Sequence, residues 1–124
     1  MDYNVILALK IMNWVTRDNR PPGHYPYLDS FGNKVVLYRS SDIPVDWDPL
    51  TNDLDALEVL RKMNQGSYLA TLSQSVPTND PTVIDWTCQL NLRNSLTTFP
   101  PGIDRSMAKS ISIAVLLAIG KTLS

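Results

Sequence analysis

Hydrophobic and polar residues alternate almost without interruption along residues 82–94, TVIDWTCQLNLRN. A β-strand turns successive side chains to opposite faces, so this pattern predicts a strand with one apolar and one polar face. The apolar face, which we expect in the core, carries Ile84, Trp86, Cys88, Leu90 and Leu92. The polar face carries Thr87, Gln89, Asn91 and Arg93. It either contacts plain solvent or lines a groove or a subunit junction.

Residues 34–38 (KVVLY) are a short β-branched run and a predicted strand, and residues 68–72 (YLATL) are predicted as another strand. A turn around Gly32 and Asn33 leads into the first. The segment VPTNDP is rich in turn-forming residues, and predicts that strands 68–72 and 82–94 pair in antiparallel fashion.

Helical spacing marks three other segments. Residues 2–14 predict a helix whose buried stripe is Val5, Leu9 and Met12, widened by Ile6, Ala8 and Ile11. The middle helix begins after Thr51 or Asn52 as N-cap and ends at Gly66 in the left-handed conformation. Its predicted buried stripe is Leu54, Leu57, Leu60 or the stem of Arg61, and Met63.

The last predicted helix covers residues 105–119, with Asp104 as N-cap and Gly120 as the stop signal. It is apolar on more than one side, which is typical of a helix that is central to the core or part of a subunit interface. We therefore predict a homo-oligomer.

A chain of 124 residues predicts a single compact domain, 1–124, with long loops at 15–33 and 39–51. The order helix–strand–helix–strand–strand–helix is typical of an α+β fold. We expect a small three-layer α/β/α-type sandwich, with about three helices and a three-stranded, mostly antiparallel sheet.

Three segments resemble a known family in the right order along the chain. LALKIMNW resembles the opening helix of the phage ABA sandwich domain family, DPLTNDLDALEVLRKM its middle helix, and SMAKSISIAVLLAIG its closing helix. The resemblance implies a layered α/β/α fold and a phage or prophage origin. It implies no catalytic residues.

Composition narrows the function classes. The chain is 44% hydrophobic and 19% charged with a net charge of −1, so it predicts a globular protein for which nucleic acid is an unlikely partner. One cysteine and one histidine permit no internal disulfide and no histidine-rich metal site. The start of the chain does not read as a signal peptide, and no apolar run is long enough to span a membrane. We expect a soluble protein of the host bacterial cytoplasm.

Enzyme motifs are missing from the sequence, which has no glycine-rich phosphate loop, GxSxG, HExxH or CxxC. His24 beside Asp18 or Asp29 is better interpreted as a polar surface residue. Asp46 and Asp48 lack the further oxygen ligands that a cation needs. We predict no catalytic residue, no metal and no cofactor.

Two places suit the binding of an anion or nucleotide. At the start of the last helix, Arg105 and Lys109 lie on one face beside unpaired backbone N–H groups, unless Asp104 already fills that place. In the loop TRDNRPPGHYPYL, arginines and tyrosines that can stack a base and pair its phosphate are interleaved: Arg17, Arg20, Tyr25 and Tyr27. Arg93 ends its strand within reach of either place. The loop residues alternatively cover a sheet edge or meet another subunit.

These features favour binding over catalysis. The first hypothesis is a phage inhibitor of antiphage defence that sequesters a nucleotide signal. The alternative is an inhibitor or accessory factor that binds a host defence protein directly, through an apolar patch on the last helix or on the loop around Trp47.

Overall fold

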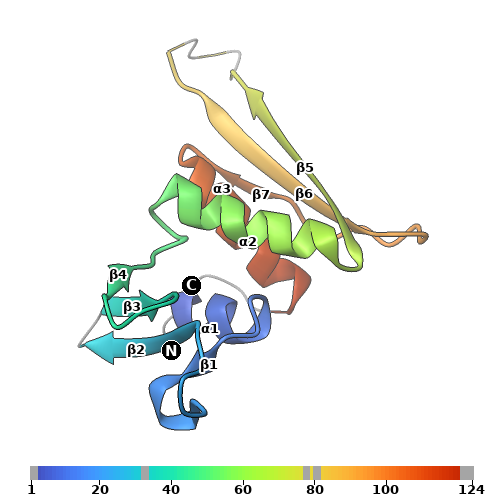
Figure 1. The fold of residues 1–124 in the computed structure, drawn as a ribbon. Helices are drawn as coiled ribbons and strands as arrows, with labels where there is room; N and C mark the ends of the chain where they lie inside the picture. Colours follow the sequence, from blue (N-terminus) through green and yellow to red (C-terminus); the bar gives the residue numbers. More distant parts are fainter. Residues whose placement is uncertain (1–2, 32–33, 77–78, 80–81, 121–124) are drawn as a thin grey trace. The chain divides into compact units, whose positions relative to one another are not determined.

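The computed structural model describes residues 3–31, 34–76, 79 and 82–120. The chain divides into two compact units, unit 1 (Met1–Asp48) and unit 2 (Pro49–Ser124), each with its own sheet (Figure 1). The α+β class is confirmed, because the described residues form three α-helices and two sheets of four and three strands. The prediction of a single domain stays a prediction.

Unit 1 contains strands that the sequence analysis did not predict. Its elements are α1 (Tyr3–Lys10), β1 (Val15–Thr16), the 3-10 turn η1 (Arg17–Asn19), β2 (Tyr27–Phe31), β3 (Lys34–Tyr38) and β4 (Val45–Asp46). The sheet order is β1-β2-β3-β4, with β1 parallel to β2 and the other pairs antiparallel. The predicted loops at 15–33 and 39–51 are therefore wrong in part, while the strand at 34–38 is confirmed.

Strands β2 and β3 form a hairpin in which Phe31 pairs with Lys34 and Tyr27 with Tyr38. The turn predicted at Gly32 and Asn33 lies outside the described residues. One face of the hairpin holds a small core of Tyr27, Val36 and Tyr38, against which Val15 and Tyr25 pack. Pairing with the strongly apolar β3 thus holds β2 in the sheet, despite the polar Asp29 and Ser30 within it.

Helix α1 is shorter than predicted, and its predicted buried stripe is confirmed only at Ile6, Ala8 and Ile11. Ile6, Leu7, Ala8 and Ile11 are buried, whereas Leu9 is 37% exposed. The helix ends because Asn13 adopts a left-handed φ of 58°, and the N–H of Trp14 then bonds back to the carbonyl of Ala8. Residue 2 lies outside the described residues.

Unit 2 contains α2 (Asp53–Gln65), β5 (Tyr68–Ser75), β6 (Asp85–Leu92), β7 (Gly102–Asp104) and α3 (Met107–Ala118). Strand β6 is central, and its predicted antiparallel pairing with β5 is confirmed, with Cys88 opposite Leu72. Helices α2 and α3 pack against each other, α2 on β5 and α3 on β6 and β7. Within unit 2 the sheet and its helices thus form two layers.

The middle helix begins as predicted, but of its predicted buried stripe only Met63 is buried. The Asn52 side chain accepts a hydrogen bond from the N–H of Asp55 at 3.0 Å, so Asn52 is the N-cap. The buried residues of α2 are Ala56, Val59 and Met63, whereas Leu54 is 77% exposed. The predicted left-handed Gly66 is wrong, because its φ is −97°.

Strand β6 confirms the predicted apolar face at its centre only. Cys88 and Leu90 are fully buried, and Trp86 and Leu92 are half-buried. Ile84 is 47% exposed because it precedes the strand and has no paired neighbour there, so the prediction that it lies in the core is wrong.

Helix α3 is central to unit 2, as one of the two predicted alternatives requires. Its buried residues are Ala108, Ser110, Ile111, Ser112, Ala114, Val115 and Leu116. Gly120 stops the helix with a left-handed φ of 81°, as predicted. The predicted N-cap is wrong, since Ser106 holds that position. No helix within the described ranges is long and apolar enough to cross a membrane.

Candidate functional site

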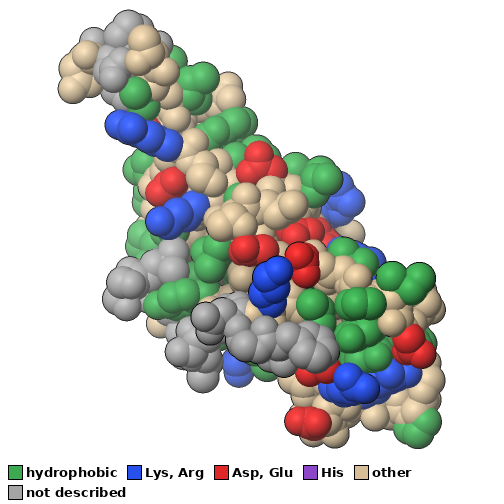
Figure 2. Space-filling model, turned by 90° about the vertical axis from the view of Figure 1, so that its left-hand side faces the viewer, with side chains coloured by type: hydrophobic (Ala, Val, Ile, Leu, Met, Phe, Trp, Pro, Cys, Tyr) green, Lys and Arg blue, Asp and Glu red, His purple; other side chains and the backbone are tan. Residues whose placement is uncertain are grey.

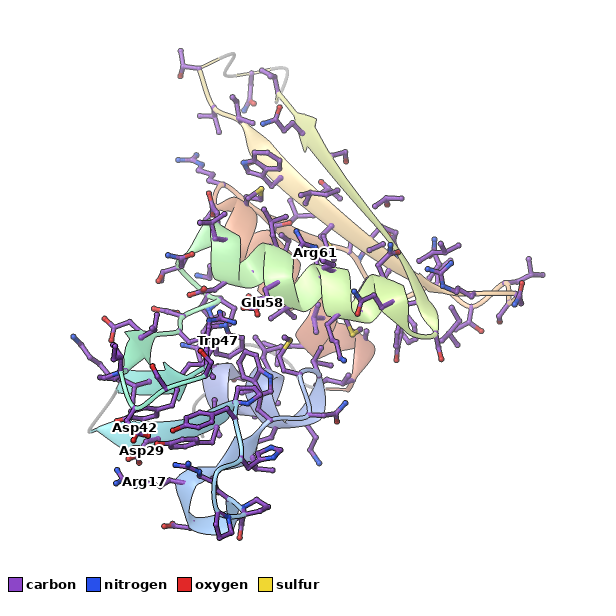
Figure 3. The ribbon with its side chains drawn as sticks, in the orientation of Figure 1. Arg17, Asp29, Asp42, Trp47, Glu58 and Arg61 are labelled. Atoms are coloured by element: carbon purple, nitrogen blue, oxygen red, sulfur yellow. The ribbon has the colours of Figure 1, made fainter. Side chains whose placement is uncertain are left out.

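Four of the predicted site residues meet on unit 1. The guanidinium carbon of Arg20 lies 4.0 Å from the centre of the Tyr27 ring and 4.7 Å from that of Tyr25. The rings of Tyr27 and Tyr38 stack, with centres 4.6 Å apart and planes 9° from parallel. Arg17 pairs with Asp29 at 2.9 Å (Figure 3). We call Arg20, Tyr25, Tyr27 and Tyr38 the arginine–tyrosine cluster.

The cluster leaves no face of Tyr27 open to a base. Tyr38 stacks on one face of the Tyr27 ring. Arg20 lies close to the centre of that ring and therefore covers the opposite face. Tyr27 is accordingly only 3% exposed. The expectation that Tyr27 stacks a nucleotide base is therefore wrong, and the ring instead anchors β2 through packing and a cation–π contact.

Hydrogen bonds to carboxylates fix the rim of the cluster. The Tyr25 hydroxyl donates to Asp42 at 2.7 Å, and this bond raises the pKa of Tyr25. The hydrogen bond from Arg17 to Asp29 raises the pKa of the Arg17 guanidinium, which stays charged. The Nε atom of Arg20 is buried and has no hydrogen-bond partner within the described part of the chain.

A hollow of about 300 Å³ lies beside the Arg17–Asp29 pair. It is lined by Val5, Thr16, Arg17, Asp18, Leu28 and Asp29. Val5 and Leu28 are apolar, Thr16 supplies a hydroxyl, and Arg17 supplies the positive charge. We call this the Arg17 hollow. Mixed apolar and polar linings of this kind, with a few convergent polar groups, are typical of small-molecule sites.

The helix N-terminus predicted to bind a phosphate is already occupied. The backbone N–H of Ala108 donates to the Asp53 carboxylate at 3.2 Å, and that of Lys109 donates to the Ser106 hydroxyl at 3.3 Å. Arg105 precedes α3 and so does not share a helical face with Lys109. The predicted anion site at Arg105 and Lys109 is therefore wrong. The two side chains do not share a helical face, and the Asp53 carboxylate of α2 already accepts the hydrogen bond that an anion would accept.

Arg93 closes the C-terminal end of α2. Its Nε atom donates to the carbonyl of Gly66 at 3.1 Å, and its terminal nitrogen donates to the carbonyl of Asn64. These carbonyls are ones that a helix end leaves without an intrahelical partner. Arg93 thus has a structural role within unit 2.

The polar face of β6 is half-buried along Thr87, Gln89 and Asn91. The amide of Gln89 donates to the carbonyls of Leu90 and Phe99. A fully solvated face would leave these side chains exposed. Other segments of the same chain, such as the one with Phe99, therefore cover part of this face of β6.

Sequence reasoning missed Tyr38 of the cluster and Asp42 at its rim, although the Gly-Asn dipeptide at positions 32 and 33 is a hairpin signal in the sequence. His24 is exposed on its loop. Asp48 accepts a hydrogen bond from Asn4 at 3.0 Å. No group of three or more metal-ligating side chains occurs among the residues that the structure describes.

Charged side chains of both signs are interspersed on the face shown in Figure 2. No known family, characterised protein or solved structure matches this chain. The resemblance to the phage ABA sandwich domain stays a prediction, and the function has to be argued from the geometry.

Proposed function

We propose that this chain is a non-enzymatic small phage or prophage protein that binds a nucleotide-type ligand in the Arg17 hollow. By sequestering a nucleotide signal in the host bacterial cytoplasm, it inhibits an antiphage defence. The observation that carries the proposal is the hollow itself, in which the Arg17 guanidinium, the Thr16 hydroxyl and an apolar side chain converge beside two carboxylates, those of Asp18 and Asp29.

The chemistry of the lining suits a nucleotide. The Arg17 guanidinium presents a planar fork of donors, which matches two oxygens of a phosphate. Asp18 and Thr16 are acceptors for the hydroxyls of a ribose, and the half-buried Val5 offers an apolar contact for a base, with the buried Leu28 behind it. These roles use groups that the hollow already holds in place.

Asp29 does not prevent a phosphate from binding. The Arg17 side chain is 59% exposed and that of Asp29 is 22% exposed. Ion pairs that exposed are weak, since water and salt screen them. A nucleotide phosphate therefore competes for the outer edge of the guanidinium while Asp29 keeps the inner one.

Isothermal titration calorimetry tests the proposal, with a panel of cyclic and ADP-ribose-type nucleotides. We expect heat of binding with at least one nucleotide, and we expect that nucleotide to be recovered chemically intact when the complex is boiled. An intact nucleotide also shows that the protein binds the ligand without converting it. No heat with any nucleotide, together with no ligand released from the boiled protein, would overturn the proposal.

The alternative, direct binding of a host defence protein, is supported by another observation. Within the loop around Trp47, Trp47 itself adds nothing to an apolar patch, because it is 1% exposed and packs edge-on against Trp14 with ring centres 5.0 Å apart. The apolar residues exposed before it are Ile43 at 72% and Val45 at 47%. Substitution Ile43→Asp should abolish capture of such a partner if this alternative holds, and leave nucleotide heat unchanged.

A further inference from the structure

Strand β5 is an edge strand of the unit 2 sheet, with β6 on one side only. The N–H of Arg93 bonds to the carbonyl of Ser67, which fixes the pairing pattern along the two strands. Odd-numbered residues of β5 therefore bond to β6, and the even-numbered ones turn their backbone groups to the open edge. Ala70 confirms this, because its N–H bonds to the Asn64 side chain at 3.2 Å.

This open edge lacks the usual protection. Natural edge strands carry charged residues, prolines or bulges that block pairing with another chain. The eight residues of β5, YLATLSQS, include no charged residue and no proline, and they pair with β6 without a bulge. The backbone groups of Leu72 and Gln74 thus form an open template for another strand.

A second apolar surface adjoins the same edge. A hollow of about 210 Å³ is lined by Leu57, Leu60, Arg61 and Asn64 of α2 and by Ala70 of β5. These α2 residues lie on the helix face opposite the buried Val59 and next to the exposed Leu54. Helix α2 therefore has two apolar faces: Ala56, Val59 and Met63 are buried on one, and the half-buried Leu57 and Leu60 lie on the other.

We propose that β5 pairs antiparallel with β5 of a second copy of this chain, which joins two three-stranded sheets into one of six strands. An antiparallel edge is self-complementary, because a two-fold axis places one residue opposite its own copy and repeats every other donor–acceptor pair on the far side of the axis. A strand without charges meets its own copy without like-charge repulsion. Side chains at the end of the partner's β5 then lie over the Leu57–Leu60 hollow.

The register follows from the edge. With Leu72 opposite Leu72 of the partner subunit, Gln74 lies opposite the partner's Ala70, whose carbonyl accepts from the Gln74 N–H while the N–H of Ala70 stays bonded to Asn64. The half-buried even-numbered side chains of β5 keep their contacts to α2, since the new pairing uses backbone groups only. Val76, which is 53% exposed just beyond the strand, then gains an apolar neighbour.

Analytical ultracentrifugation of the full chain between about 1 and 100 μM tests this inference, with circular dichroism to verify folding. We expect a concentration-dependent dimer. Gln74→Pro removes one outward N–H without touching the ladder to β6, and should weaken the dimer about tenfold or more. The matched Gln74→Ala removes the same side chain but keeps the N–H, and should leave the dimer intact.

Leu57→Glu places a charge in the hollow and should also weaken the dimer, whereas the control Leu96→Glu, at a fully exposed leucine, should not. A chain that is monomeric at every concentration would overturn the inference. A dimer that Gln74→Pro and Leu57→Glu both leave unchanged would overturn it equally. The result is independent of nucleotide binding, which belongs to unit 1.

Discussion

The Asp53 carboxylate of α2 accepts a hydrogen bond from the backbone N–H of Ala108, in the first turn of α3, at 3.2 Å. The two residues are 55 positions apart in the sequence. One carboxylate therefore joins the N-terminal ends of both helices of unit 2, and it occupies the place where a phosphate was expected.

Asp53→Ala should lower the free energy of unfolding by about 1 kcal/mol, because a helix N-terminus loses an acceptor. Asp53→Asn keeps an amide oxygen at that place and should lose less. Urea denaturation followed by circular dichroism measures both variants. Equal and negligible effects would show that the bond contributes nothing to stability.

Gly102→Ala should be among the most damaging substitutions in unit 2. A Cβ atom at this position would lie 2.1 Å from the carbonyl oxygen of Ser110 and 2.6 Å from the backbone nitrogen of Ala114. Backbone atoms of a packed helix cannot move away cheaply, so α3 would separate from β7, at a cost of about 3 kcal/mol or more. Thermal denaturation measures the loss.

Gly66→Ala is the matched control for that substitution. Its Cβ atom would meet nothing nearer than the Met63 carbonyl oxygen at 3.6 Å, and its φ of −97° is ordinary for any residue. We expect stability within about 1 kcal/mol of the wild type. A comparable loss at both glycines would contradict the close packing of β7 on α3.

Burial raises the pKa of the Cys88 thiol from 9.0 to about 11. Between these pH values the unfolded chain loses the thiol proton while the folded protein keeps it. The unfolded state then binds fewer protons, so the free energy of unfolding falls as the pH rises from about 9 to about 11. This component should be missing from the pH profile of Cys88→Ala, measured by urea denaturation.

The same burial predicts a slow thiol. Cys88 is fully buried, and the thiolate rather than the thiol attacks disulfide reagents. At pH 8 we expect Ellman's reagent to react with Cys88 only after denaturant is added. Rapid reaction in the native protein would contradict the position of Cys88 beneath α3.

Arg20→Ala should destabilise unit 1 by about 1 kcal/mol, because the cation–π contacts to Tyr25 and Tyr27 are lost. Arg105→Ala is the control, since Arg105 is exposed and lies outside α3. Unfolding followed by tyrosine and tryptophan fluorescence distinguishes the two. A similar small effect in both variants would show that Arg20 is only a surface charge.

The sequence predicted what strong local patterns dictate. Strands β5 and β6 alternate clearly, and Asn52 and Gly120 are typical cap residues, so these features were found. The buried face of α2 was predicted wrongly at Leu54 because both faces of this helix are apolar. The prediction favoured the face with the larger leucines, such as Leu57. The smaller side chains of Ala56 and Val59 are the ones that fit beneath the helix.

Tertiary contacts decided the rest. Strand β2 exists through its pairing with β3, which no local propensity around Asp29 indicates. Within the candidate site, the sequence indicated that arginines and tyrosines would meet. It could not show that Arg20 would cover Tyr27, or that Arg17 would remain at the wall of a hollow with Asp29 beside it.

The most direct test of the central claim compares the heat of nucleotide binding in the wild type and in Arg17→Ala, with Arg105→Ala as the matched control. The account predicts that a nucleotide from the cyclic or ADP-ribose class binds the wild type and Arg105→Ala alike. It predicts a loss of about tenfold or more in affinity for Arg17→Ala, because a charged hydrogen-bond fork to phosphate is removed. Equal affinity in all three proteins, or binding that is lost only in Arg105→Ala, would contradict a ligand site in the Arg17 hollow.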